Sequence, residues 1–562
     1  MNGRRLILFL TALIATVILL LANVYVQSRL DSIIQEDSLV DAEYVDGAPP
    51  VVAFTTVALG GFRGIIADFL WLRTISLQEQ GKYFELAQLA SWITKLQPKS
   101  TAAAAYLGWN MAYNISVTCQ SPEDRWRWVH RGIEVLQEAL RYNPNDPELY
   151  KELGWIYQHK LGNVLDDAQR YYKYEMARIF LHAYGTHYPD WEALAAAPKT
   201  ESGLKEMFPP DHPLWKIMKA WGFESLDVLL ERFEFLGKLP PDMESVPPSL
   251  AGDETVRRLT AEELETLSLY LRARWLRTEY IIDPQVIVDI NRNYGELDWL
   301  LPESFAIYWA TQGIAYSPMK ADTNSERMIV QSLQVSFSNG RMLLPDNQAS
   351  MYFMLVPNLA LVDAVKRYYD EVIERNPDVP SFKHAREYFY TDAAVLLYSY
   401  GQYAKSREYY NLLRREFKGN KANRLDFDAF ILTEWTEDIT DASYKQANDY
   451  IPLLIFRSCV LLGYGDREAA AGHLRMARFA YDKYHRSFSD TERMALPPFD
   501  VMKSEVTKAC MAAYPFLADR LKAEILSENS GSSAPAADAS SAPGAWESGN
   551  PDPNAGKTAK KP

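Results

Sequence analysis

With 562 residues, the chain is long enough for several domain-sized units or for one extended repeat protein. Apolar residues make up 48% of it, so most of the chain can bury a core. Its formal net charge of −14 argues against a nucleic-acid partner, because nucleic-acid binding requires a basic face that displaces counterions.

An apolar run near the N-terminus predicts a membrane anchor. The run extends from Leu6 to Val26, and about 20 apolar residues suffice to span a bilayer as a helix. Arg4 and Arg5 precede it and acidic residues follow it, so the positive-inside rule places the N-terminus in the cytoplasm. We assign residues 1–27 to a signal anchor that is retained, with cleavage as the alternative, and residues 28–56 to an acidic juxtamembrane linker. The body is then periplasmic and tethered by a single pass to the inner membrane.

A short phrase occurs twice in the part of the chain that follows. Tyr106-Leu107-Gly108-Trp109 returns as Glu152-Leu153-Gly154-Trp155, each time within a helical pattern. A further predicted helix lies between the two and ends near Pro144, since proline cannot continue a helix. The small residue in each phrase lets a neighbouring helix approach closely. The pattern indicates helices stacked in pairs.

This pattern resembles the tetratricopeptide repeat (TPR) family. Its repeat of about 34 residues has a large residue, Leu-Gly and Tyr on the first helix, and Ala, Phe or Tyr, Ala and Pro on the second. Residues 67–98, 101–144 and 147–176 match that order, the middle stretch with an insertion. A fourth unit matches between Ala364 and Tyr410, and a looser fifth runs from Asn448 to Tyr484. The resemblance implies an all-α, TPR-like solenoid of helical hairpins. An ordinary helical bundle is the alternative.

The organisation of the rest follows from where the repeat pattern holds. We assign TPR-like repeats to 57–176, a helical insert to 177–345 and a second TPR-like block to 346–526. Within the insert we expect helices over Leu214–Leu236 and Ala261–Tyr280, whereas the short run Met328–Phe337 is ambiguous between helix and strand. Thr260 and Glu263 have capping-box spacing at the start of the second helix. Residues 527–562 are rich in Ser, Ala and Pro, which predicts a disordered tail.

The two repeated tryptophans, Trp109 and Trp155, are the main candidates for a binding site. The resemblance implies that this position lines the concave groove of the solenoid. Helical phase places further candidates near it: Trp71, Asn110, Lys151, Glu152 and Gln158. Tryptophan is enriched in the energetic centres of interfaces, and a groove of this kind suits an extended peptide or a partner helix. The alternative is that both indoles pack between helices.

The passage most typical of an enzyme is Tyr294 to Phe305. It holds Glu296, Asp298 and Glu303 among aromatic residues, a composition found where glycans are cleaved. Glu303-Ser304 also resembles the catalytic Glu-Ser of lytic transglycosylases, but the Gly-Leu-Met-Gln motif of that family does not follow. We favour a helix start with a carboxylate in its first turn, and no catalytic residue.

No cofactor or metal site is predicted. His182 and His187 do not share one helical face, and the cysteines lack metal-binding spacing. We expect Cys119, Cys459 and Cys510 to be buried thiols, with a Cys459–Cys510 disulfide as the alternative.

Taken together, these patterns predict a membrane-anchored, extracytoplasmic scaffold that binds a protein or peptide partner in an envelope assembly and is not an enzyme. The alternatives are a peptidoglycan-processing enzyme that uses Glu303 and a purely structural spacer.

Overall fold

The computed structural model describes residues 63–531, apart from 98, 164, 254, 320–321, 345–347, 352, 437–443 and 488–495, together with residues 22, 25, 26 and 29. The described chain is almost entirely helical, which confirms the all-α class. Within it, the strands β1 (Arg341–Leu343) and β2 (Met354–Val356) form one antiparallel pair with Met342 opposite Leu355.

Two predicted segments lie wholly or mostly outside the described residues. The anchor and linker, residues 1–56, are outside them except for the four single positions. Among the described helices, none is both long and apolar enough to cross a bilayer. The predicted tail begins too early, because α24 (Pro515–Gly531) continues five residues past 526; residues 532–562 are outside the described part.

The chain divides into two compact units. The first comprises the chain up to Ala393 together with Tyr409–Asn420. The second comprises Ala394–Glu408 and the chain from Lys421 onward. The boundary therefore falls inside α18 (Pro380–Ser399) and α19 (Tyr403–Glu416). Both helices belong to the stretch predicted as a single block at 346–526.

The first unit opens with helices that pack against their neighbours in the chain. Contacts join α3 to α4, α4 to α5, α5 to α6, and α6 to α7 and α8. The turn after α3 contains Gly81, whose φ of +69° suits glycine. Side-chain caps set the later starts: Ser121 accepts from the Asp124 amide, and Asp146 accepts from the Glu148 and Leu149 amides. The elements are α3 (Arg63–Glu79), α4 (Tyr83–Leu96), α5 (Thr101–Trp109), η2 (Asn110–Ile115), η3 (Ser116–Thr118), α6 (Pro122–Tyr142), α7 (Pro147–Trp155), η4 (Ile156–Gly162) and α8 (Gln169–Tyr184).

The segment predicted as an insert begins with short helices. The single helix expected over 214–236 is wrong, because the chain breaks at Gly222, whose φ is +85°, and forms two helices. The predicted capping box at Thr260 and Glu263 is present at the start of α13. The elements are α9 (Trp191–Ala196), α10 (Glu201–Met207), α11 (Pro213–Ala220), α12 (Leu226–Leu236), η5 (Pro241–Glu244), η6 (Pro248–Leu250), α13 (Ala261–Thr278) and α14 (Pro284–Tyr294).

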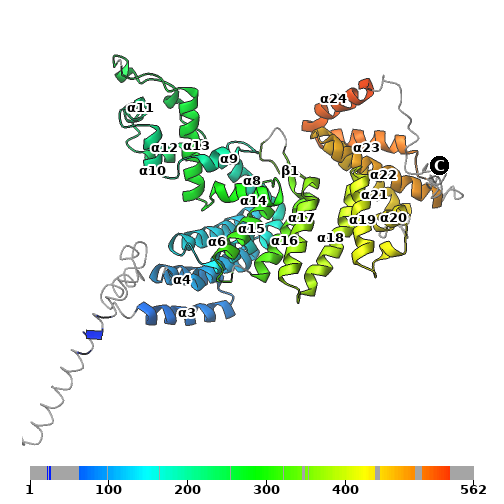
Figure 1. Ribbon diagram of the computed structural model, residues 1–562, viewed down its shortest axis with the longest axis horizontal. Helices are drawn as coiled ribbons and strands as arrows, with labels where there is room; N and C mark the ends of the chain where they lie inside the picture. The colour runs from blue at the N-terminus through cyan, green and yellow to red at the C-terminus, as the bar shows by residue number, and fades with distance from the viewer. Residues whose placement is uncertain are drawn as a thin grey trace, which may run out of the picture. The chain divides into compact units, whose positions relative to one another are not determined.

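The centre of the first unit is α15 (Pro302–Tyr316). Its residues from Pro302 to Ala310 are all buried, as expected of a helix that is apolar on every side. It packs on α7 and η4 and on α16 (Thr323–Asn339), which in turn contacts α17 (Val362–Arg375) after η8 (Leu359–Leu361) (Figure 1). The ambiguous run Met328–Phe337 is thus part of a helix, and this packing joins the predicted insert to the segment predicted as repeats.

The second unit is built around α21 (Tyr444–Gly463). It packs on α22 (Arg467–Ser487), α23 (Phe499–Ala513) and α24, while α20 (Phe427–Thr436) and η9 (Lys421–Asn423) precede it. The turn between α21 and α22 contains Gly465 at a φ of +87°. Cys459 and Cys510 are buried here as free thiols. Cys119 in the first unit is also free, but it is half-buried, so the prediction that it is buried is wrong.

Candidate functional site

In each copy of the Leu-Gly-Trp phrase, the first two residues face the core and the third faces outward. Leu107 and Leu153 are buried. A Cβ on Gly108 would lie 2.9 Å from the Leu136 side chain, and one on Gly154 would lie 3.4 Å from the Ala306 carbonyl oxygen, so both glycines permit close helix contacts. The indoles that follow are 38% exposed at Trp109 and 40% exposed at Trp155. The alternative in which both indoles pack between helices is therefore wrong.

Each tryptophan stands where the helix changes its geometry. α5 ends at Trp109 and α7 ends at Trp155, and a π-helical segment follows each, η2 and η4 respectively. Each indole stacks on the ring four residues further on: the centroids of Trp109 and Tyr113 are 5.7 Å apart, and those of Trp155 and His159 are 4.7 Å apart. π-Helical segments are rare and occur often at functional sites. Because a π-helical segment follows the tryptophan in both copies of the phrase, this face of the first unit is a candidate for the functional site.

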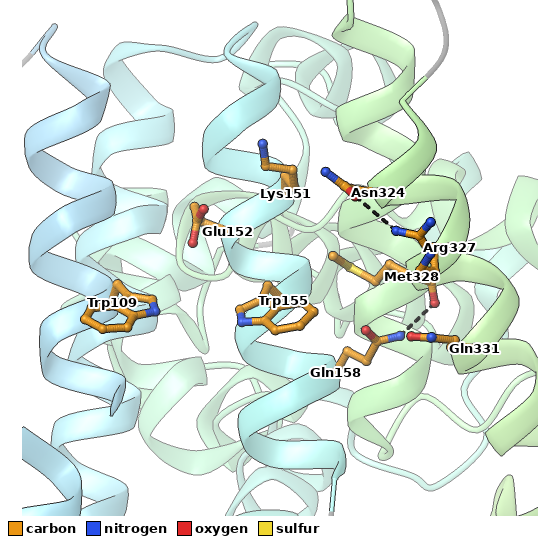
Figure 2. Close-up of a pocket in the computed structure, with 9 residues that line it drawn as sticks. All are labelled: Trp109, Lys151, Glu152, Trp155, Gln158, Asn324, Arg327, Met328 and Gln331. Carbon is orange, nitrogen blue, oxygen red and sulfur yellow. Dashed lines mark hydrogen bonds between the residues drawn. The ribbon is translucent and has the colours of Figure 1, made fainter. Parts of the chain in front are cut away.

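The two indoles line one cavity of about 340 Å³ together with α16 (Figure 2). In the close-up they lie side by side on neighbouring helices, with Glu152 between them and slightly above. Gln158 joins the two walls, because its side-chain amide donates to the Met328 carbonyl at 2.9 Å and to the Ser332 hydroxyl at 3.0 Å. The lining residues are Trp109, Lys151, Glu152, Trp155, Gln158, Asn324, Arg327, Met328 and Gln331.

A second cavity of about 550 Å³ continues from the first between η4 and the C-terminal half of α16. The two share Trp155, Gln158 and Gln331, and we call the combined feature the indole groove. Amides and hydroxyls dominate the remaining lining: Asn163, Ser332, Gln334, Ser338 and Asn339. Gln334 already donates to Asp392 and accepts from Tyr369. Amide side chains both donate and accept hydrogen bonds, as a peptide backbone requires of its partner, and Gln331 and Asn339 supply such groups to the lining.

Glu152 is the carboxylate of the first cavity, and it has no ion pair among the described residues. It is half-buried, and burial raises its pKa more than the nearby Lys151 lowers it. Lys151 is itself paired with Glu148. Arg327 donates to Asn324 at 3.3 Å, and its guanidinium lies 5.6 Å from the centre of the Phe382 ring. The first cavity therefore presents one carboxylate whose charge is not compensated by a bonded cation among the described residues.

Two polar atoms beneath the indoles lack a hydrogen-bond partner among the described residues. They are the Tyr113 hydroxyl and His159 Nδ1, whose rings are 5.7 Å apart. Burial, and then the charge of Glu152, raise the pKa of Tyr113, whereas burial and the nearby Lys160 lower the pKa of His159. Both side chains are therefore neutral at pH 7. A buried polar atom without a partner costs about 1–3 kcal/mol. His159 lines the second cavity, so its Nδ1 favours a polar group bound there, whereas Tyr113 lines neither cavity.

Glu303 lies at the base of the second cavity, in the first turn of α15. It is buried, and this burial raises its pKa despite the opposing charge of Lys173. The other two carboxylates of the enzyme-like passage are engaged elsewhere. Asp298 accepts from His187 at 3.1 Å and from the Met342 amide at 2.7 Å, and Glu296 accepts from Asn291 at 3.0 Å.

Of the seven residues predicted from sequence, the groove brings together five: Trp109, Lys151, Glu152, Trp155 and Gln158. Asn110 is a correction. It is fully buried, donates to the Tyr106 carbonyl at 2.8 Å and accepts from Asn114 at 2.6 Å, because the next helical position after Trp109 turns back toward the core. Trp71 on α3 lies outside the lining, with its ring edge-to-face against Tyr106 at 5.2 Å.

Sequence reasoning did not find the wall that α16 provides. Asn324, Arg327, Met328 and Gln331 have the spacing of one helical face, which is visible in the sequence. What is not visible is the pairing of that face with α7 and η4, since Gln158 and Met328 are 170 residues apart.

Comparison with known proteins gives no relative: no family model matches the sequence, and no curated protein matches it either. The functional argument therefore depends on the groove itself.

Proposed function

We propose that this chain is a membrane-anchored, extracytoplasmic scaffold whose indole groove binds a protein or peptide partner in an envelope assembly. In this proposal the helix pairs α3–α4, α5–α6 and α7–α8 are TPR-like repeats. The apolar run Leu6–Val26 is the anchor that holds the body on the periplasmic side of the inner membrane.

One observation carries the proposal: two large aromatic side chains remain exposed side by side in a groove whose other lining residues are mostly polar. Trp109 and Trp155 come from equivalent positions of the repeated phrase and keep more than a third of their surface in solvent. Aromatic side chains bordered by hydrogen-bonding groups are typical of interface centres. The amides of the second cavity suit an extended backbone, so the favoured occupant is a peptide segment of the partner.

The proposal predicts that Trp109→Ala combined with Trp155→Ala abolishes partner capture and leaves helical content unchanged. Truncating a tryptophan at the centre of an interface costs about 2 kcal/mol or more, which is roughly thirtyfold in affinity per residue. We would place a photo-crosslinking amino acid at Gln331 in the full chain, irradiate native membranes and identify the adducts by mass spectrometry. Circular dichroism measures the helical content.

Matched controls separate binding from folding. Trp71→Ala removes an indole from outside the groove and should leave the adducts intact. A crosslinker at the exposed Glu265 on α13 should give no adduct that depends on the two indoles. Adducts that persist in the double variant would contradict the proposal. Loss of helical content in that variant would instead assign the indoles a structural role.

A second function, peptidoglycan processing with Glu303 as the general acid, has one observation in its favour. Glu303 reaches the second cavity, and burial raises its pKa, as in carboxylic acids that donate a proton to a leaving group. Incubation of the protein with purified peptidoglycan tests it. Release of muropeptides that disappears in Glu303→Gln would support this function, and absence of release from the wild-type protein would eliminate it.

A further inference from the structure

We propose that the indole groove selects a cationic side chain, lysine or arginine, which the bound peptide inserts between Trp109 and Trp155 against the Glu152 carboxylate. This inference rests on the proposed function and specifies the chemistry of the partner.

The first argument is charge. Glu152 is half-buried at the groove and forms no ion pair among the described residues. Its sequence neighbour Lys151 is held by Glu148, so that cation is already compensated. A carboxylate that is partly withdrawn from water and has no partner gains most from an incoming cation, because the attraction between charges strengthens as the surroundings become less polar.

The second argument is the aromatic surroundings. Figure 2 shows Glu152 above and between the two indoles, on the same wall of the cavity. Each indole is covered on one side by the ring four residues on, Tyr113 or His159, and remains more than a third exposed elsewhere. Tryptophan is the best aromatic partner for a cation, and attraction is felt within about 6 Å of the ring centre. Two indoles and a carboxylate together form the chemistry of a cation site.

An acidic peptide is the competing occupant. Arg327 lies on the opposite wall and, among the described residues, forms no ion pair. Its guanidinium is nevertheless hydrogen-bonded to Asn324 and placed over Phe382. An acidic side chain would meet two cations that are already engaged, Arg327 and the Lys151 that Glu148 holds, and its own charge would face Glu152 across the cavity. The arrangement therefore favours a cation at the indoles.

Selection from a random peptide library on the full-length protein in detergent tests the inference. We expect Lys or Arg at one fixed position in the enriched peptides. Replacing that residue in a synthetic peptide by a neutral analogue of similar length, norleucine for Lys or citrulline for Arg, should weaken binding about tenfold. Glu152→Gln should weaken the cationic peptide by a similar factor and leave the neutral analogue almost unaffected, which is the coupling that a double-mutant cycle measures.

Controls address charge and folding. Glu265→Gln changes the net charge equally at an exposed position on α13 and should not alter affinity. Glu152→Asp keeps the carboxylate and should retain part of the preference for the cation. Circular dichroism of each variant verifies that helical content is unchanged.

The experiment distinguishes failure of the cation site from failure of the proposed peptide-binding function. The cation site is contradicted if the peptides that bind through the indoles show no enrichment of Lys or Arg. It is also contradicted if the neutral analogue binds equally well. Both outcomes remain consistent with a groove that binds peptides. Enrichment of acidic peptides whose binding is lost in Arg327→Gln would also overturn it. If no peptide binds in a manner that depends on Trp109 and Trp155, the proposed function fails as well.

Discussion

In each copy of the repeated phrase, a glycine that must be small is followed directly by a tryptophan that is exposed. Gly154 must be small because α15 and Met328 lie against it, and Trp155, the next residue, must therefore point away from that contact. The same division occurs at Gly108 and Trp109. Exposure of the indoles is thus a consequence of close helix packing on the other side of each helix.

Glu303 gives a prediction on how stability depends on pH. Burial raises its pKa, so the folded protein holds this proton more tightly than the unfolded chain does. Such a group contributes its full stability below the unfolded pKa of about 4.3 and loses it as the pH rises through the folded value. We expect Glu303→Gln, which is neutral at every pH, to be more stable than the wild type at pH 8 by about 0.5–3 kcal/mol.

Urea unfolding followed by circular dichroism between pH 4 and pH 8 measures this difference, which should shrink toward pH 4. The exposed Glu265→Gln should leave the curve unchanged. A wild type more stable than Glu303→Gln at pH 8 would mean that Lys173, which opposes the shift, stabilises the ionised carboxylate more than burial penalises it.

The repeated phrase made five of the seven candidate residues predictable, because helical phase around Trp109 and Trp155 needs only local geometry. Asn110 was misplaced for a local reason that the sequence does not display. The chain changes from α to π geometry at this residue, and its amide closes hydrogen bonds inside the unit. Trp71 belongs to a neighbouring helix, and its distance from the groove depends on how α3 stacks.

At the scale of elements, the contact between α5 and α6 gives a second prediction. A Cβ on Gly132 would lie 2.7 Å from the Gly108 carbonyl oxygen and 3.4 Å from the Met111 Cβ. Because the closest neighbour is backbone, it cannot rotate away, and Gly132→Ala should destabilise the first unit by about 1–3 kcal/mol. Thermal unfolding followed by circular dichroism provides the measurement.

Gly64→Ala is the matched control, since a Cβ there meets no atom within 4 Å and the residue lies in α3. Alanine favours a helix over glycine by up to about 1 kcal/mol, so this variant should be unchanged or slightly more stable. Equal destabilisation by both substitutions would mean that the short contact at Gly132 is relieved by a shift of the helices.

Helix starts and breaks were predictable where a side chain or a turn residue fixes them, as at the capping box of Thr260 and Glu263. The break at Gly222 was missed because the apolar pattern continues across it and only the backbone angle reveals the turn. The run Met328–Phe337 has no decisive period of its own. Packing against α15 and α17 makes it a helix.

For the whole molecule, the all-α class followed from the helical spacing of apolar residues, whereas the long-range arrangement did not. α15 and α16 come from the segment predicted as an insert, yet α15 is the buried centre of the first unit and α16 supplies the second wall of the groove. The pairing of α16 with α7 and η4 leaves no local signal, because it depends on distant neighbours. The apolar residues on every side of α15 do indicate burial, but not which helices cover it.

The π-helical segments after the two tryptophans set the directions in which the groove residues point. In π geometry each amide bonds to the carbonyl five residues back instead of four, so the angular step from Trp155 to Gln158 within η4 differs from that of an α-helix. Deleting one residue between Trp155 and Gln158 would change the direction of Gln158 relative to the indole. Gln158 would then turn away from the Met328 carbonyl and the Ser332 hydroxyl, and the bond that joins the two walls of the groove would be lost.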